Sequence, residues 1–179
     1  MADQHDEIRR LNLGARRLPK LASVPALAWS LAYNLLLFLL LIETIGPLRA
    51  VTGAEPAGAY LGRRVSYYPA MEWLEINTPP EARILFVGEG RTFYCPRECV
   101  ASSPFDSPLL ERYAAESGSE RALVARLRAE GFTHLLVSDP ELRRTRRMTA
   151  DEVMRRFFPS GAPHLEFEST GVRLYYLPA

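Results

Sequence analysis

Residue types that carry special chemistry are scarce in this sequence of 179 residues. There are two cysteines, too few for a fold built on disulfides, and three histidines, none of which stands at metal-ligand spacing from a cysteine. The net charge of +1 gives no general field for collecting nucleic acid. The composition therefore disfavours a disulfide-built scaffold, a metal site and a nucleic-acid partner.

Catalytic motifs are missing as well. No serine has G-x-S-x-G surroundings, there is no Walker-type phosphate loop, and neither a catalytic residue nor a cofactor is predicted. The run Val87-Gly-Glu-Gly-Arg-Thr-Phe93 resembles the start of a dinucleotide-binding loop, but Phe93 occupies the third glycine position and no helix pattern begins there. A sharp turn after a strand is the simpler interpretation.

One long hydrophobic segment is present. From Leu21 to Ile42 there are 22 residues without a charge, and residues 35–42 are Leu, Phe and Ile only. At 1.5 Å per residue this run spans roughly 30 Å, the thickness of the hydrocarbon core of a bilayer. It predicts a transmembrane helix over 21–45.

The basic residues around this segment predict its orientation. Five precede it (Arg9, Arg10, Arg16, Arg17 and Lys20), and three follow it closely (Arg49, Arg63 and Arg64). The positive-inside rule then places residues 1–20 in the cytoplasm as a basic tail of a single-pass protein of the inner (cytoplasmic) membrane. A cleaved signal peptide is the alternative, although the apolar run exceeds the usual core of about 7–15 residues.

The rest of the chain predicts a linker over 46–66 and one extracytoplasmic domain over 67–179. In the domain, Arg83–Val87 and Thr133–Ser138 are apolar runs that end in turns, which is typical of strands buried on both faces of a parallel sheet. A capping box is predicted at Ser117-Gly-Ser-Glu120, with a helix from there to Gly131, and this completes a βαβ unit. Within the second strand, His134 is expected to be a hydrogen-bonded sheet residue.

The C-terminal part alternates differently. A second capping box, Thr149 with Glu152, opens a helix that stops at Pro159. Leu165–Glu168 and Val172–Tyr176 alternate apolar with polar residues, which predicts an antiparallel hairpin with one solvated face. The predicted fold class is α/β: one N-terminal transmembrane helix, then a small α/β sandwich with a βαβ unit and a C-terminal antiparallel hairpin.

One group of polar residues is a candidate ligand site. If the strands that end at Val87 and Ser138 are parallel neighbours, then Glu89, Arg91, Ser138 and Asp139 emerge at the carboxyl edge of the sheet, where open α/β sheets bind ligands. The simpler alternative is that these are ordinary polar loop residues.

The run that contains Arg143, Arg144, Arg146 and Arg147 is a second candidate, because guanidinium groups pair with phosphate oxygens and could hold a phosphate, a sugar-lipid pyrophosphate or an anionic lipid headgroup. Solvated loop charge is the alternative here. Cys95 and Cys99 fit a disulfide better than a zinc site, because a zinc site needs further ligands and an extracytoplasmic domain favours oxidation.

With these motifs in place, the chain from Trp29 to Ala179 resembles the tail of bacterial multi-spanning glycosyltransferases that use lipid-linked sugars, the dolichyl-phosphate-mannose mannosyltransferase and aminoarabinose transferase-like group. The similarity rests on Ala82–Tyr94, on Gly131-Phe-Thr-His-Leu-Leu-Val137 and on Val172–Leu177. The resemblance implies a last membrane helix followed by an accessory α/β domain. The acidic catalytic motif of the family belongs to a bundle of many helices, and no position of this sequence matches it.

Three hypotheses about function follow. The first is an extracytoplasmic accessory domain on one membrane anchor, either a separate gene product or a fragment of a larger glycosyltransferase that retains only the tail. Its partners would be the membrane and a multi-spanning membrane protein or a lipid-linked sugar. The second is a free-standing envelope protein that binds a partner or a glycolipid. The third is a small enzyme that uses Glu89 and Asp139.

Overall fold

The computed structural model describes residues 20–103 and 106–178, so the predicted basic tail lies outside the described residues except for Lys20. The chain divides into two compact units, residues 1–56 and 57–179. The division falls after Pro56, ten residues before the predicted domain start, because the predicted linker is itself partly helical. It contains α3 (Pro47–Val51) and α4 (Ala57–Arg64), and α4 belongs to the second unit.

The first unit consists of α2 (Lys20–Ile45) and α3. Residues 24–45 are long and apolar enough to cross a membrane, and none of this stretch is buried within the protein. The side chains of Asn34 and Thr44 donate hydrogen bonds to the carbonyls of Ser30 and Leu40, so these polar groups have partners within the helix. These features are compatible with a single-pass membrane anchor or with a signal sequence.

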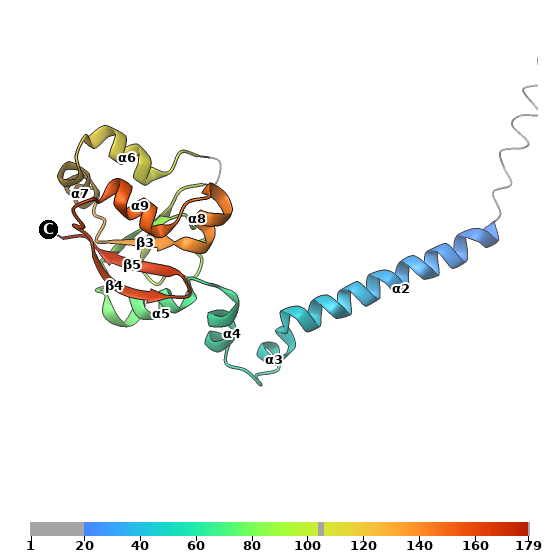
Figure 1. Cartoon of the computed structure of the whole chain (residues 1–179). Coiled ribbons are helices and arrows are strands. Elements are labelled where there is room, and N and C mark those ends of the chain that lie inside the picture. The colour runs from blue at the N-terminus through green and yellow to red at the C-terminus, as the bar shows by residue number, and fades with distance from the viewer. Residues whose placement is uncertain (1–19, 104–105, 179) are drawn as a thin grey trace, which may run out of the picture. The chain divides into compact units, whose positions relative to one another are not determined.

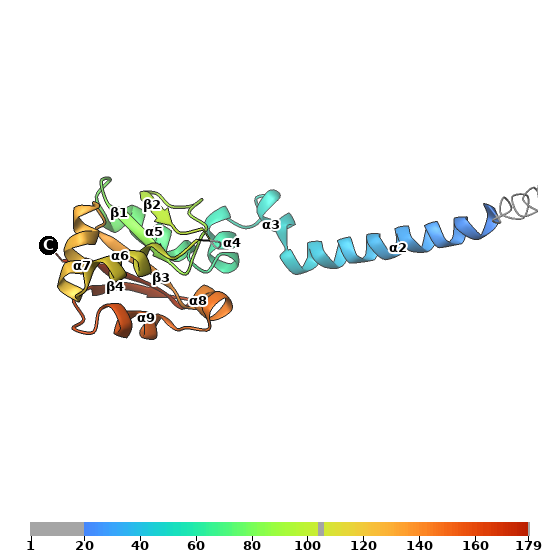
Figure 2. The same cartoon turned by 90° about the horizontal axis from the view of Figure 1, so that it is seen from above.

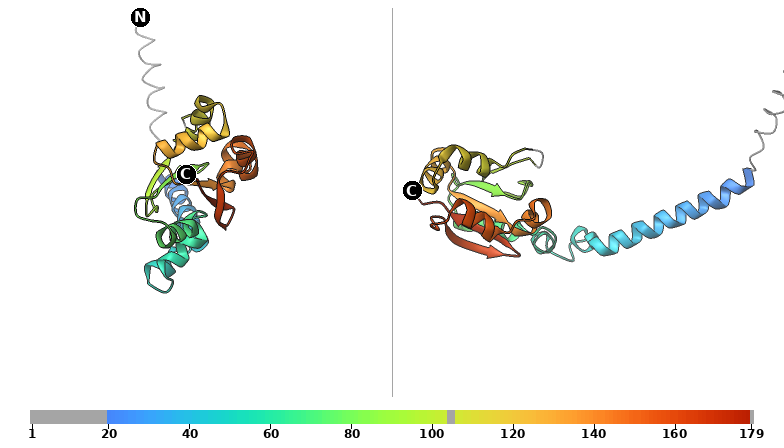
Figure 3. Two further views of the ribbon diagram at one scale, coloured as in Figure 1. Left: turned by 90° about the vertical axis from the view of Figure 1, so that its left-hand side faces the viewer. Right: turned by 45° about the horizontal axis from the view of Figure 1, so that its top comes forward.

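The second unit is built on a mixed five-stranded sheet in the order β2-β1-β3-β5-β4 (Figure 1). The strands are β1 (Arg83–Val87), β2 (Glu98–Ala101), β3 (His134–Ser138), β4 (His164–Ser169) and β5 (Val172–Tyr176). β1 is parallel to β2 and β3, while β5 is antiparallel to β3 and β4. The right-hand view of Figure 3 shows this order as green, orange and red strands. The predicted α/β fold class is confirmed.

Helices cover both faces of the sheet (Figures 1 and 2). One core cluster joins alternate strand residues such as Leu85, Leu135 and Val137 to α6 (Leu109–Ser117), α7 (Glu120–Ala129), α8 (Asp139–Arg146) and α9 (Ala150–Phe157). The other cluster joins the intervening strand residues to α5 (Tyr68–Asn77). Because β1 and β3 are buried on both faces, they are continuous apolar runs in the sequence.

Several local predictions need correction. Ser117 is the last residue of α6 and not a helix cap. Instead, Ser119 caps α7, accepting a hydrogen bond from Ala122 N. Asp139-Pro140, expected as a turn, begins α8, where Pro140 loses nothing by lacking an N–H in the first turn. The capping box of Thr149 and Glu152 is present as predicted.

Gly88 makes the close turn that ends β1. Its φ is +87°, and a Cβ built there would lie 2.6 Å from Leu142 Cγ and 3.1 Å from Ser138 O. Only glycine satisfies both the left-handed backbone and this close approach of α8. Gly118 also has a positive φ, +69°, but nothing lies within 4 Å of a Cβ built there.

Gly88→Ala is therefore expected to destabilise the domain more than Gly118→Ala. Both variants carry a left-handed penalty of about 1–2 kcal/mol, and Gly88→Ala adds the clash with α8, for a total of about 3 kcal/mol or more. Denaturant unfolding of the full chain measures both values. Equal losses in the two variants would contradict the close packing of Leu142 on this turn.

Candidate functional site

A pocket of about 720 Å³ opens at the carboxyl edge of the sheet. It lies where the chain leaves β1 and β2 toward opposite faces: Tyr94 and Cys95 of the β1–β2 connection pack on the α5 side, whereas Leu110 at the start of α6 packs on the other. In open α/β sheets such a divergence leaves a crevice that binds ligands. The wall is formed by the end of β1, the segment after β2, the start of α6 and one side of α8, and its polar side chains are Glu89, Arg91, Ser102, Ser103, Glu141, Arg144, Thr145 and Arg146.

Glu89 and Arg91 are the centre of this pocket wall. The Glu89 side chain is only 2% exposed, and both of its oxygens accept hydrogen bonds from Arg91. Arg91 Nε and its backbone N contact Oε1 at 2.8 and 2.9 Å, and Nη2 contacts Oε2 at 2.7 Å. This hydrogen-bonded pairing with Glu89 raises the pKa of Arg91 further above its already high value, despite partial burial.

The ion pairs continue along α8. Arg91 Nη2 lies 3.1 Å from Glu141 Oε1, and Arg144 Nη2 lies 2.6 Å from Glu141 Oε2. The order along the wall is thus carboxylate, guanidinium, carboxylate, guanidinium. The Arg91 guanidinium also lies over the ring of Tyr67, 5.7 Å from its centroid, and burial together with Glu89 raises the pKa of Tyr67.

Ser138 and Asp139, predicted to join this site, lie at the end of β3 and do not line the pocket. Ser138 is fully buried, and its Oγ has no hydrogen-bond partner among the described residues. Asp139 accepts from Arg143 Nε at 2.5 Å and from Ala150 N at 2.8 Å, so it fastens α8 to the start of α9. The structure therefore brings together only two of the four predicted residues.

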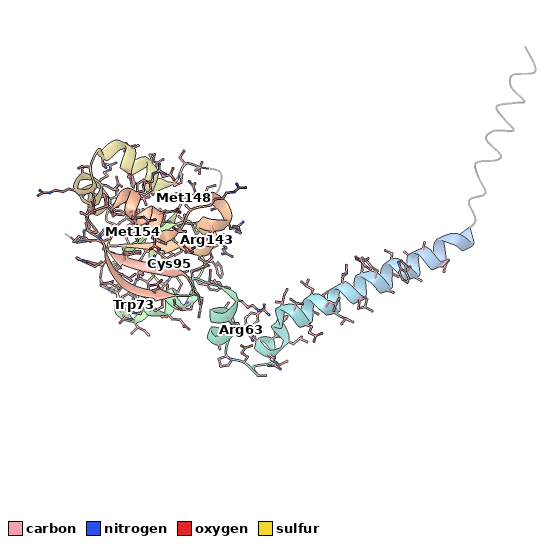
Figure 4. The ribbon with its side chains drawn as sticks, in the orientation of Figure 1. Arg63, Trp73, Cys95, Arg143, Met148 and Met154 are labelled. Atoms are coloured by element: carbon pink, nitrogen blue, oxygen red, sulfur yellow. A yellow bond between two sulfur atoms is a disulfide. The ribbon has the colours of Figure 1, made fainter. Side chains whose placement is uncertain are left out.

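The arginine run is also arranged differently from the prediction. Arg143, Arg144 and Arg146 lie in α8, where they pair with Asp139, Glu141 and Glu111, respectively. Arg147 caps the helix with a φ of +54°. Figure 4 labels Arg143, which does not line the pocket, whereas Arg144 and Arg146 do. Three of the four arginines of the predicted phosphate site therefore already have carboxylate partners.

Some pocket residues were missed because α8 was not anticipated. Glu141 and Thr145 lie one turn apart on that helix, and Thr145 donates to Glu141 O at 2.6 Å. The signal that could have found them is Asp139-Pro140-Glu141, acidic residues around a proline, which is typical of a first helical turn. No sequence pattern marked Ser102 as a pocket residue. Its position depends on a hydrogen bond that its Oγ accepts from Leu109 N, seven residues further along the chain.

A disulfide constrains the end of the β1–β2 connection that leads into β2. Cys95 and Cys99 form a disulfide with their Cα atoms 6.2 Å apart (Cys95 is labelled in Figure 4). Between them, Arg97 donates to the carbonyl oxygens of Glu75 and Thr78 at 2.9 and 2.8 Å and thereby satisfies the end of α5. Both ends of the connection are therefore held by specific bonds.

His134 is a buried sheet residue, as predicted. Its Nδ1 lies 2.8 Å from Thr133 Oγ1 and its Nε2 lies 3.2 Å from Glu166 Oε2. Burial lowers the pKa of His134 despite the nearby Glu166 carboxylate, so the ring is neutral at pH 7. Among the residues described, no three His, Cys, Asp or Glu side chains are grouped so that they could hold a metal ion.

No family model, curated protein or solved structure matches the chain.

Asp139 provides a pH-dependent prediction. Burial alone would raise its pKa, but the hydrogen bonds from Arg143 and Ala150 N outweigh burial and hold the pKa below its usual value. The unfolded state therefore takes up the proton first, and the stabilisation by Asp139 is lost as the pH falls below about 4 and through the folded pKa.

Asp139→Asn should lower the free energy of unfolding by about 1 kcal/mol at pH 7, because Asn keeps an acceptor for Ala150 N but loses the charge that attracts Arg143. The difference from the unsubstituted protein should shrink as the pH falls from about 5 to 2. Urea unfolding across this range measures it, with Glu116→Gln on the exposed side of α6 as the control. A difference independent of pH would show that the Asp139 charge contributes nothing.

Proposed function

We propose that this chain is an accessory domain held outside the cytoplasmic membrane by a single N-terminal anchor, where it assists a multi-spanning glycosyltransferase of the lipid-linked-sugar class without transferring sugar itself. The observation that carries this proposal is a long apolar helix with no cover inside the protein, joined to an α/β domain with a pocket. The resemblance of the sequence to the tail of such transferases supplies the class of partner.

The carboxylates in the domain support a role without catalysis. A transferase of this kind needs a carboxylate that can accept a proton from the acceptor hydroxyl. Both oxygens of Glu89 are bonded to Arg91, and Asp139 is bonded to Arg143 and Ala150 N, with a lowered pKa that makes it a weaker base. Neither the Glu89 nor the Asp139 carboxylate is therefore well placed to act as a general base.

The chain enters the α/β domain beside the pocket. Ser66 O accepts a 2.6 Å hydrogen bond from Thr170 Oγ1 in the β4–β5 turn, and the next residue of that turn, Gly171, accepts from Asp139 N at 2.9 Å. Arg91 lies over Tyr67. The chain therefore enters the second unit at the same edge of the sheet as the pocket.

The pocket also favours a second candidate, a free-standing envelope protein that binds a glycolipid or another ligand by itself. The two candidates differ in their dependence on a partner enzyme. The experiments below therefore test location first and dependence second.

The expected topology is an N-terminus in the cytoplasm and the α/β domain outside, with the helix uncleaved. Alkaline phosphatase fused after Ala179 should be active, the membrane-bound product should keep an N-terminal tag, and Cys95 and Cys99 should resist alkylation until reductant is added. A cytoplasmic reporter fused at the same point is the control. Activity of that reporter, with an inactive phosphatase, would overturn the orientation, and loss of the tag would show a signal peptide.

The purified full chain is expected not to transfer sugar from polyprenyl-phosphate donors, because one helix cannot form a groove for the lipid and the carboxylates are already bonded. Deleting the gene should reduce transfer in membranes of the source organism, and adding back the full chain should restore it. Turnover by the purified chain that Asp139→Asn or Glu89→Gln abolishes would replace this proposal with an enzyme. Unchanged transfer in the deletion strain would favour the free-standing protein.

A further inference from the structure

We propose that the carboxyl-edge pocket binds an uncharged, hydroxyl-rich ligand, the chemical class of mono- and oligosaccharides. This inference goes beyond the accessory role, because it assigns a ligand class to the pocket whether or not a partner enzyme is present. It rests on the charge balance of the wall, on the hydrogen-bonding groups left over after the internal bonds are made, and on the apolar surface beneath them.

Each charged side chain on the wall has an ion-pair partner, and for Arg146 that partner, Glu111, lies outside the pocket lining. Glu89 and Glu141 are balanced by Arg91 and Arg144 through direct ion pairs, and Arg146 is balanced by Glu111 at 3.0 Å. A phosphate or carboxylate ligand would have to compete with carboxylates that are already in place. An uncharged ligand does not face this competition.

The hydrogen bonds of the Arg91 guanidinium also favour an uncharged ligand over an anion. Anions are recognised most strongly by a guanidinium fork that donates two parallel N–H bonds. In Arg91, Nε and Nη2 form such a fork with Glu89, and Nη2 also donates to Glu141. Of the three guanidinium nitrogens of Arg91, only Nη1 has no partner among the described residues. A ligand can therefore receive hydrogen bonds from this one nitrogen only. This suits one hydroxyl or ether oxygen better than a phosphate.

The remaining groups on the wall match hydroxyls in both directions. Ser102 Oγ accepts from Leu109 N, which leaves its O–H free to donate. Thr145 Oγ1 donates to Glu141 O, which leaves its lone pairs free to accept. Glu141 supplies further lone pairs on its carboxylate. A sugar hydroxyl both donates and accepts, so a ligand with several hydroxyls can use the donor of Ser102 and the acceptors of Thr145 and Glu141.

The pocket also has the size and apolar surface for such a ligand. Val87 and Leu110 are buried beneath the lining, and the half-buried Leu109 offers carbon surface to the C–H groups of a sugar ring. Its volume of about 720 Å³ lies within the usual range of roughly 300–1,000 Å³ for small-molecule sites.

The test uses the full chain in lipid nanodiscs, because glycoside detergents would compete for the pocket. The probes are methyl glycosides of glucose, mannose, galactose, arabinose and N-acetylglucosamine, together with maltotriose and chitotriose, and binding is followed by saturation-transfer NMR. At least one neutral probe should bind, and glucose 1-phosphate and inorganic phosphate should bind no more tightly. Binding by none of the neutral probes, or tighter binding of the phosphates, would overturn the assignment.

Two pairs of variants locate the binding. Thr145→Val should weaken it about five- to tenfold through the loss of one acceptor, while Thr145→Ser retains it. Arg144→Gln should weaken it, whereas Arg126→Gln, which removes an exposed arginine that pairs with Glu130 and does not line the pocket, should not. Equal effects within either pair would place the binding elsewhere. Since no partner enzyme is present, failure here leaves the result of the gene-deletion experiment unaffected.

Discussion

The arrangement of the site depends on one buried carboxylate. Glu89 is 3% exposed at the end of a strand buried on both faces, and a charge in that position is tolerable only if it is paired and fully hydrogen-bonded. Arg91 meets both requirements: its guanidinium pairs with the Glu89 carboxylate, and its side chain and backbone N donate three hydrogen bonds to the two carboxylate oxygens. The sharp turn at Gly88 makes this possible, because it sends Glu89 back toward the sheet while α8 packs directly against the glycine.

This pairing has consequences beyond the turn. Arg91 bonds Glu89 through Nε and Nη2, and Nη2 also donates to Glu141 of α8. Arg91 thereby links the segment between β1 and β2 to α8. Glu141 in turn holds Arg144, and Thr145 bonds to the backbone of Glu141. The far end of the same connection is held by the disulfide and by Arg97. The wall of the pocket is thus fixed by bonds made within the protein, before any ligand is present.

The sequence predicted those parts of the fold whose pattern is set by burial. The strands at Arg83–Val87 and His134–Ser138 are continuous apolar runs because helices cover both faces. The antiparallel hairpin is present as predicted, but its single solvated face is not: β5 is buried on both faces, through Val172 and Leu174 on one and Tyr175 on the other, and only the edge strand β4 is mostly exposed. It did not predict α8 or β2. α8 buries only Leu142, and its run of charged residues has the composition of a loop. β2 has four residues, all exposed or half-buried, so no apolar pattern marks it. Glu89 and Arg91 were predicted by the rule on carboxyl edges, whereas Ser138 and Asp139 were misplaced because the rule does not say that α8 begins there and uses Asp139 for α9.

Glu89 and Asp139 are both held by bonds within the protein. A general base needs a proton affinity near the working pH and the freedom to leave its present partners and reach the substrate's proton. Releasing Glu89 would leave a buried charge unpaired, which costs several kcal/mol, and releasing Asp139 would detach α8 from α9. A binding site has no such requirement, because a ligand can add to groups that stay in place. A wall whose charged side chains are already ion-paired can therefore add hydrogen bonds to an uncharged polar ligand without breaking any of its own.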